Sequence, residues 1–273
     1  MSVAEEKYSD NELKVAAILE PLYKKYEYRG LIAYEEIFKE LSEGNYDYGF
    51  DFHLRSQLVN HYSWAIPNQE ALETITKWSP HGLVEIGAGG GYWGYLLRQR
   101  MYLKCHLYDL NPEEPYGERE SIKMWTQVEK GSVEKLNQWT HGKTLFLCWP
   151  CYSESWAYEA LLKWQIAVSP AIIYIGEGGY MGCTGDEQFN NLLDGVEGCE
   201  YGKNKYHYVE SIDIPNWSGI HDGLHVYKNI NYGNEIDVYE DLWWGYEKIY
   251  GELPSYINPK GVPDRLRYFK AGG

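Results

Sequence analysis

Four glycines within five residues follow an apolar strand and precede an apolar helix start in the stretch LVEIGAGGGYWGYLL, residues 83–97. Glycine lets the backbone approach a ligand closely, and the first turn of the following helix points unpaired N–H groups toward it. The stretch therefore predicts a strand–loop–helix unit that binds a dinucleotide or a nucleoside.

Two spacings of these glycines distinguish between the ligand classes. A dinucleotide fingerprint, G-x-G-x-x-G, should begin at Gly87, but its third glycine would then fall on Tyr92. The register that satisfies this fingerprint begins two residues late, at Gly89. The pattern E-x-G-x-G-x-G fits without displacement, as Glu85, Gly87, Gly89 and Gly91.

The second pattern resembles motif I of the class I S-adenosylmethionine (SAM) dependent methyltransferases, whose loop cradles the methionine end of the cofactor. The next strand, CHLYDLN, ends at Asp109, where the resemblance implies an acid that binds the two ribose hydroxyls; a helix N-cap is the alternative. After the third strand, the resemblance places Ser132 and Val133 against the adenine, although a serine after a glycine also suits an ordinary turn. The implied cofactor is SAM, bound by Glu85, Gly87, Gly89, Gly91, Asp109, Ser132 and Val133.

Short apolar runs alternate with helical patterns after Pro80. Seven runs read as strands: GLVEIGAG, KCHLYDLN, TQVEKGS, TLFLCWP, AIIYIGEGG, HYVESIDIP and GLHVYKN. Such alternation predicts a mainly parallel sheet covered by helices, and the last two strands, which have no long helical pattern between them, predict an antiparallel hairpin at the sheet edge. The expected fold class is α/β, a Rossmann-like, mainly parallel seven-stranded sheet with helices on both faces and a helical N-terminal cap.

Three segments are expected along the chain. Residues 1–80 carry helical periodicity, interrupted and restarted at Pro67 and Asn68, and form the N-terminal cap. Residues 81–232 form the SAM-binding core, and residues 233–273 form a Tyr- and Trp-rich arm that packs back on it. Tyr62, Trp64 and Pro67 fit either a hinge that folds over the cofactor or ordinary core packing.

The fourth strand ends in the stretch TLFLCWPCYSES, at the position of motif IV in the resemblance. In methyltransferases that act on amino nitrogens, this motif commonly reads (Asp/Asn/Ser)-Pro-Pro-(Tyr/Phe/Trp). The segment Trp149-Pro150-Cys151-Tyr152 agrees at the first proline and at the aromatic residue. We expect the backbone carbonyls of Trp149 and Pro150 to face the acceptor and Tyr152 to stack on it.

Two alternatives for this segment stay open. It caps the sheet without a further role, or Cys148 and Cys151 form a redox or zinc pair. The second is disfavoured because the other cysteines of the odd set of five supply no second ligand pair at zinc-site spacing.

Further candidates lie after the fifth strand and before the seventh. Glu177 suits binding a cationic acceptor or taking a proton from an amine. Asp186 suits a helix cap better than a site. His221 and Asp222 form either an acid–base pair or part of a plain turn.

The net charge of −15, from 40 acidic and 25 basic residues, opposes nucleic-acid binding and favours a small-molecule or amine-bearing acceptor. No transmembrane run or signal peptide is visible, which predicts a cytoplasmic protein without a membrane partner. The predicted function is SAM-dependent methyl transfer through Trp149, Pro150, Tyr152 and Glu177, without a metal. The alternatives are a SAM- or nucleoside-binding protein that has lost the chemistry and a nicotinamide oxidoreductase.

Overall fold

The computed structural model describes residues 10–27, 31–44, 48–114, 122–136, 140, 142–152, 154–166, 169–178, 182–194 and 206–229. The expected C-terminal arm, residues 233–273, lies outside the described residues. The helices are α1 (Asp10–Tyr26), α2 (Ala33–Ser42), α3 (Tyr48–His61), α4 (Gln69–Lys77), α5 (Tyr92–Met101), α6 (Trp156–Ile166) and α7 (Glu187–Asp194). The strands are β1 (Leu83–Ile86), β2 (Cys105–Asp109), β3 (Glu129–Lys130), β4 (Thr144–Cys148), β5 (Ala171–Gly176), β6 (Tyr206–Asp213) and β7 (Gly223–Asn229).

One seven-stranded sheet has the order β3-β2-β1-β4-β5-β7-β6. The first five strands run parallel, and β7 is antiparallel to both of its neighbours. Each of the seven predicted strands is present, and the predicted antiparallel hairpin is confirmed, with β6 at the sheet edge and β7 between β6 and β5. The predicted Rossmann-like fold class is therefore confirmed.

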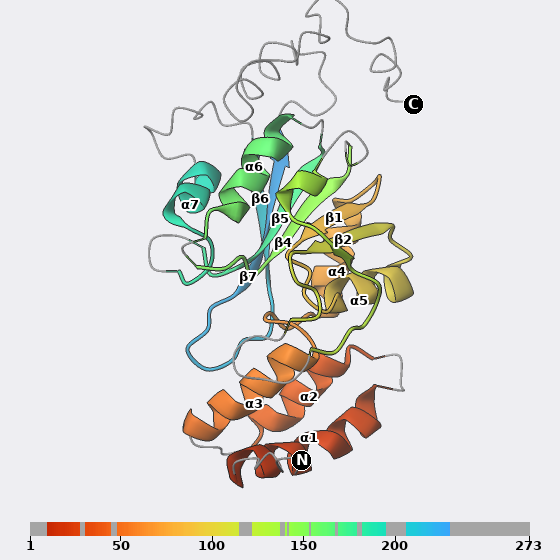
Figure 1. Cartoon of the computed structure of the whole chain (residues 1–273), viewed down its shortest axis with the longest axis vertical. Helices are drawn as coiled ribbons and strands as arrows, with labels where there is room; N and C mark the ends of the chain where they lie inside the picture. Colours follow the sequence, from red (N-terminus) through yellow and green to blue (C-terminus); the bar gives the residue numbers. More distant parts are fainter. Residues whose placement is uncertain are drawn as a thin grey trace, which may run out of the picture.

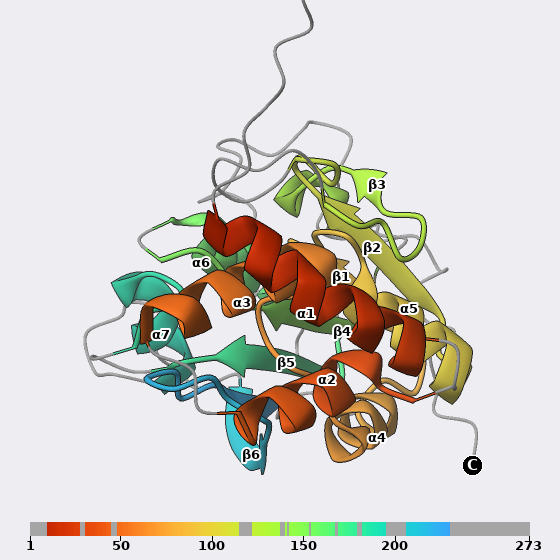
Figure 2. The same cartoon turned by 90° about the horizontal axis from the view of Figure 1, so that it is seen from below.

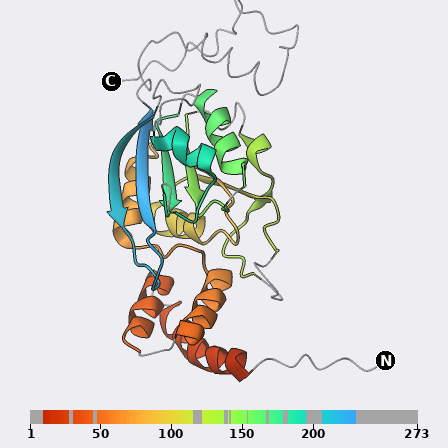
Figure 3. The ribbon, with the colours of Figure 1, turned by 90° about the vertical axis from the view of Figure 1, so that its left-hand side faces the viewer.

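Helices cover both faces of the sheet because alternate strand residues point to opposite sides. Leu83 of β1 packs into one apolar cluster with α4 and α5, whereas its neighbours Val84 and Ile86 pack into a second cluster with α6 and α7. Seen edge-on, α6 and α7 lie on one side of the sheet, opposite α4 (Figure 3). The two clusters form the core on either side of the sheet.

The helices α1, α2 and α3 form a layer of their own beyond one end of the sheet (Figure 1). Figure 2, seen from below, shows this layer in front of the strand ends. The backbone N–H of Tyr34 in α2 donates to the hydroxyl of Tyr92, 3.3 Å away, at the start of α5. Tyr92 directly follows the glycine loop, so this layer, called the cap below, lies at the carboxyl edge of the parallel strands, where such folds bind ligands.

The fourth helix belongs to the sheet layer although it lies within residues 1–80. It contacts α5 and β6. It begins after Asn68, whose side-chain oxygen accepts a hydrogen bond from the N–H of Ala71 at 2.8 Å, as the predicted restart after Pro67 requires. Within the described part of the chain, no helix is both long enough and apolar enough to cross a membrane.

Candidate functional site

The glycine loop connects β1 to α5 through a backbone path that suits glycine. Gly87 and Gly91 have φ of 79° and 76°, a conformation that side chains rarely adopt. A Cβ on Gly87 would lie 2.9 Å from the ring of Trp156, and one on Gly91 would lie 2.8 Å from a methyl of Val128. Backbone conformation and packing thus explain these two glycines by themselves, and the case for a ligand depends on the acids beside the loop.

The first of these acids, Asp109, ends β2 and contacts the glycine loop directly. Its Oδ2 accepts a hydrogen bond from the N–H of Gly89 at 2.8 Å, and its Oδ1 accepts one from the N–H of Asn111 at 2.9 Å. An ionised carboxylate has about four lone-pair sites, so each oxygen retains acceptor capacity for a hydroxyl. The acid and the loop that the sequence assigns to one ligand are therefore in contact.

The second acid, Glu85, is 2% exposed in the middle of β1. Among the described residues its Oε2 has no hydrogen-bond partner. Burial, reinforced by the charge of Asp109 and partly offset by Arg98, raises its pKa to about 8. A buried carboxyl without a partner is costly to the fold, and a donor or a cation from a ligand would relieve that cost.

Ser132 and Val133 lie beside Asp109, because the N–H of Gly131 donates to the backbone oxygen of Asp109 at 2.8 Å. The N–H of Ser132 is bound by the carboxylate of Glu134, at 3.0 Å to each oxygen. Val133 is half-buried against the α6 side of the core. Their position is compatible with an adenine, and their contact with it stays a prediction.

Trp149, just past β4, is held in an uncommon conformation. Its φ is 55°, although it is a bulky residue, and such strain concentrates at functional sites. Its indole Nε1 donates to Oδ1 of Asp222 at 2.6 Å, and its ring stacks on Trp64 with centroids 4.6 Å apart and planes 6° apart. The side chain is thus a fixed wall between the cap and the tips of β4 and β7.

The two other motif IV candidates are placed differently from Trp149. The backbone oxygen of Pro150 accepts a hydrogen bond from the N–H of Gly185 at 2.9 Å, so part of its acceptor capacity is used within the protein. Tyr152 is 67% exposed. The structure therefore does not bring Tyr152 into the buried group around Trp149, and its stacking on an acceptor stays a prediction.

The thiols of Cys148 and Cys151 are both free. Burial raises the pKa of each, which disfavours the reactive thiolate. In the described part of the chain, no three His, Cys, Asp or Glu side chains cluster closely enough to hold a metal ion.

Glu177 follows β5 and binds the loop before β7. Its Oε1 accepts a hydrogen bond from the backbone N–H of His221 at 2.5 Å. Burial raises the pKa of Glu177, but hydrogen bonds from Cys183 and from the N–H of His221 outweigh burial and lower it overall. Glu177 is therefore a stable anion beside the β4 tip, and a proton acceptor only for a strongly acidic donor.

His221 and Asp222 are neighbours in sequence but face different partners. The side chain of His221 is 85% exposed, with Nδ1 3.5 Å from Oε1 of Glu177. Asp222 is 6% exposed and bound to Trp149; burial raises its pKa to about 6. They do not form an acid–base pair with each other. Asp186 caps α7 as predicted, since its Oδ1 accepts from the N–H of Phe189 at 2.7 Å.

Arg55 of α3 is a site residue that the sequence analysis missed. Its guanidinium carbon lies 5.3 Å from the ring centre of Trp64 and 5.4 Å from that of Trp149, within the range of cation–π attraction. Its Nε and Nη2 are shielded from solvent and have no hydrogen-bond partner among the described residues. The only signal in the sequence is an arginine between Leu54 and Leu58, which are fully buried.

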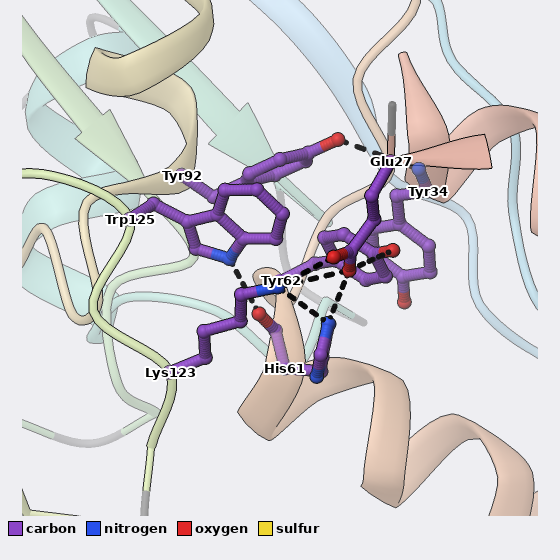
Figure 4. Close-up of polar contacts among 7 residues, drawn as sticks. All are labelled: Glu27, Tyr34, His61, Tyr62, Tyr92, Lys123 and Trp125. Atoms are coloured by element: carbon purple, nitrogen blue, oxygen red, sulfur yellow. Dashed lines mark hydrogen bonds and ion pairs between the residues drawn. The ribbon is translucent and has the colours of Figure 1, made fainter. Parts of the chain in front are cut away.

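A polar cluster under aromatic rings joins the cap to the core (Figure 4). Oε1 of Glu27 lies 2.6 Å from His61 Nε2, and both oxygens of Glu27 lie 2.9 Å from Nζ of Lys123. The ring of Tyr62 stacks on Trp125, with centroids 5.3 Å apart. The backbone N–H of Trp125 donates to the oxygen of Gly90 at 2.8 Å, so this cluster ties the cap to the glycine loop.

Two residues of the segment before β1, Tyr62 and Trp64, have different surroundings. Tyr62 is 3% exposed within the aromatic core, which agrees with core packing. Trp64 instead extends to the β4 tip and stacks on Trp149.

Comparison of the chain with known proteins finds similarity only in structure. No family model and no curated protein matches the sequence. An rRNA methylase from Streptococcus thermophilus is similar over 59% of this chain and 94% of its own, with 14% identity and a TM-score of 0.36. Magnesium protoporphyrin IX methyltransferase from Synechocystis, with bound SAM, is similar over 84% and 100%, with 10% identity and a TM-score of 0.36.

A third solved structure, geranyl diphosphate methyltransferase in complex with GPP and sinefungin, is similar over 82% of this chain and 95% of its own. The identity is 11% and the TM-score 0.39. All three are methyltransferases. The similarity is distant in each case, and their acceptors differ from one another.

Proposed function

We propose that this protein is a SAM-dependent methyltransferase that acts on a small-molecule or amine-bearing acceptor. The observation that carries the proposal is the contact between Asp109, at the end of β2, and the N–H of Gly89 in the loop after β1. It joins the two elements of the motif I resemblance at the carboxyl edge of a Rossmann-like sheet, where nucleoside ligands bind. The unpartnered Oε2 of Glu85, two residues before the loop, adds a second polar group that suits a ligand.

Different residues at this edge of the sheet would bind different parts of the cofactor. Asp109 would accept hydrogen bonds from the ribose hydroxyls, and Ser132 and Val133 would contact the adenine. Glu85 would face the cationic amino group of the methionine end. The pKa of Glu85 would then fall on binding, because a neighbouring positive charge favours the ionised carboxylate. Gly87, Gly89 and Gly91 leave room for the backbone to approach.

Bound SAM supplies an electrophilic methyl group on a sulfonium centre. The chain's own task is to align the acceptor with that group, to exclude water and to surround the positive charge with aromatic faces and oxygens. The rigid indole of Trp149 forms an aromatic wall at the β4 tip, and the anionic Glu177 favours a cationic or amine acceptor there. The amine's proton passes to water as the nitrogen gains its methyl group, because the lowered pKa of Glu177 makes its carboxylate a poor proton acceptor.

One contact and one exposed side chain at the β4 tip favour a second function, a protein that binds the cofactor without transferring its methyl group. The backbone oxygen of Pro150 already accepts the N–H of Gly185, and Tyr152 is mostly exposed. Both of these groups were predicted to hold the acceptor. Methyl transfer would then be absent although the cofactor binds.

Competition and product analysis separate these functions from each other and from a nicotinamide oxidoreductase. The protein is incubated with SAM labelled in the methyl group and a panel of small amines, and labelled products are resolved by chromatography. The proposal expects label on an amine and displacement of SAM by S-adenosylhomocysteine but not by NADH. Binding of SAM without any labelled product across the panel would favour the binding protein, and tight NADH binding without SAM binding would refute both.

A further inference from the structure

The unpartnered face of Arg55 has a defined shape. Nε and Nη2 lie on one edge of the planar guanidinium, where their N–H groups form a fork that matches the two oxygens of a carboxylate. Both atoms are shielded from solvent and lack an acceptor among the described residues. By contrast, the guanidinium of Arg98 donates to Oγ1 of Thr126 and to the backbone oxygen of Cys105, both at 2.7 Å. A buried fork without an acceptor is costly to keep, so a ligand oxygen pair is the natural partner.

Arg55 lies on the acceptor side of the β4 tip. The charges that act on Glu85 are those of Asp109 and Arg98, whereas Arg55 acts on Asp222 and Cys183. Four strand steps separate β2 from β7, which Asp222 directly precedes, and at about 4.8 Å a step this is about 19 Å. The indole of Trp149 points toward Asp222 and hence away from Asp109. The ribose position and Arg55 are therefore on opposite sides of Trp149.

The groups around Arg55 favour one kind of anion. Asp222 and Glu177 place negative charge in the same region, which repels a dianion such as a phosphate monoester more than a singly charged carboxylate. Glu177 also suits a cationic amine, as argued above. A molecule with an amine and a carboxylate meets both requirements at once.

We propose that the methyl acceptor carries a carboxylate, which Arg55 binds through Nε and Nη2 beside the Trp64–Trp149 stack. The proposal rests on the proposed methyltransferase function and names the chemical class of its acceptor, a small amine that also bears a carboxylate. Because Nε and Nη2 are shielded from solvent, entry of the carboxylate requires a small displacement of α3 or of the loop before β7.

Acetate tests the site without knowledge of the acceptor. The Nε–H resonance of Arg55 is identified in the full chain as the one missing from Arg55→Lys, which keeps the charge and removes the fork. Sodium acetate is then titrated against sodium chloride at equal ionic strength. The expected result is a saturable shift of this resonance with a midpoint of about 1 to 10 mM acetate, without a chloride response. The Nε–H of Arg98, whose guanidinium is already hydrogen-bonded, is the internal control and should not shift.

Three results would overturn the proposal. The first is no acetate-specific shift up to about 100 mM, and the second is tighter saturation by inorganic phosphate than by acetate. The third concerns the cofactor, since S-adenosylhomocysteine carries a carboxylate that 5′-methylthioadenosine lacks. If Arg55→Lys weakens the first ligand more than about tenfold and leaves the second unchanged, Arg55 binds the cofactor's carboxylate. Failure of the wild type to bind S-adenosylhomocysteine would instead refute the proposed function, while the acetate result would still report on Arg55.

Discussion

Replacing Glu27 by glutamine is expected to lower the free energy of unfolding by about 2 to 3 kcal/mol at pH 7. In the folded protein, burial raises the pKa of Glu27, but hydrogen bonds from His61 and Lys123 outweigh burial and lower it from 4.5 to about 2. A shift of about 2.5 units at 1.36 kcal/mol per unit gives ~3 kcal/mol, which is an upper bound because the side chain keeps some contact with solvent. The variant also leaves Lys123 without its buried counter-charge.

The pH dependence of this effect has a defined sign. The folded pKa of Glu27 is depressed, so its stabilisation is present above pH 4.5 and is lost as the pH falls toward 2. Urea denaturation of both proteins should therefore show a difference at pH 3 that is less than half of the difference at pH 7. The same difference at both pH values, or none at pH 7, would refute the reasoning.

A matched control for Glu27 is available on the cap surface. Glu40 pairs with Lys25 at 2.6 Å, but both side chains are well exposed, at 39% and 45%. Solvent screens such a pair, so Glu40→Gln should cost less than about 0.5 kcal/mol at pH 7. A cost equal to that of Glu27→Gln would mean that burial of the cluster is not the cause.

Three further outcomes are expected. Burial destabilises the ionised form of Asp222 and raises its folded pKa from 3.8 to about 6. As the pH rises through this range, Asp222→Asn should therefore become more stable than the wild type, by up to ~3 kcal/mol in urea denaturation. A stability difference that does not depend on pH would contradict this. Gly91→Ala should lower the melting temperature clearly more than Gly219→Ala, since both have φ near +77° but only at Gly91 would a Cβ collide with Val128; equal losses would remove packing as the cause. Glu85, with a pKa of about 8, is mostly protonated at pH 7 and should ionise when the cationic amine of S-adenosylhomocysteine binds beside it. Calorimetric titrations in buffers of different ionisation enthalpy should therefore show release of about 0.9 proton on binding. Glu85→Gln should abolish this release.

The fold was predictable because its signals are local. The strands β1, β4 and β5 are short apolar runs, and β1 and β5 are buried along their whole lengths, as parallel strands covered on both faces should be. The caps at Asn68 and Asp186 follow from residue chemistry at helix starts. The assignment of α4 to the sheet layer was not visible, because an amphipathic pattern shows that a face is buried and not what covers it.

The contact between Asp109 and the glycine loop was predictable from spacing, whereas the group around Arg55 and Trp149 was not. Glu85 lies one residue before the end of β1 and Asp109 ends β2, and adjacent parallel strands bring such positions together. Arg55, Trp149 and Asp222 come from three distant segments, and only tertiary packing places the guanidinium beside the indole and the indole on the carboxylate. Tyr152 illustrates the converse, since its motif-like position does not place it in the buried group around Trp149.

Calorimetric titration with S-adenosylhomocysteine, comparing the wild type with Asp109→Asn, tests the central claim most directly. Asp186→Asn is the matched control, because the Asp186 carboxylate is used to cap α7, where it accepts from the N–H of Phe189. We predict micromolar binding by the wild type and by the control, and at least about a tenfold loss in Asp109→Asn, since the amide has one acceptor oxygen and no charge for the ribose hydroxyls. No binding by the folded wild type, or equal binding by all three proteins, would contradict a SAM site at the ends of β1 and β2.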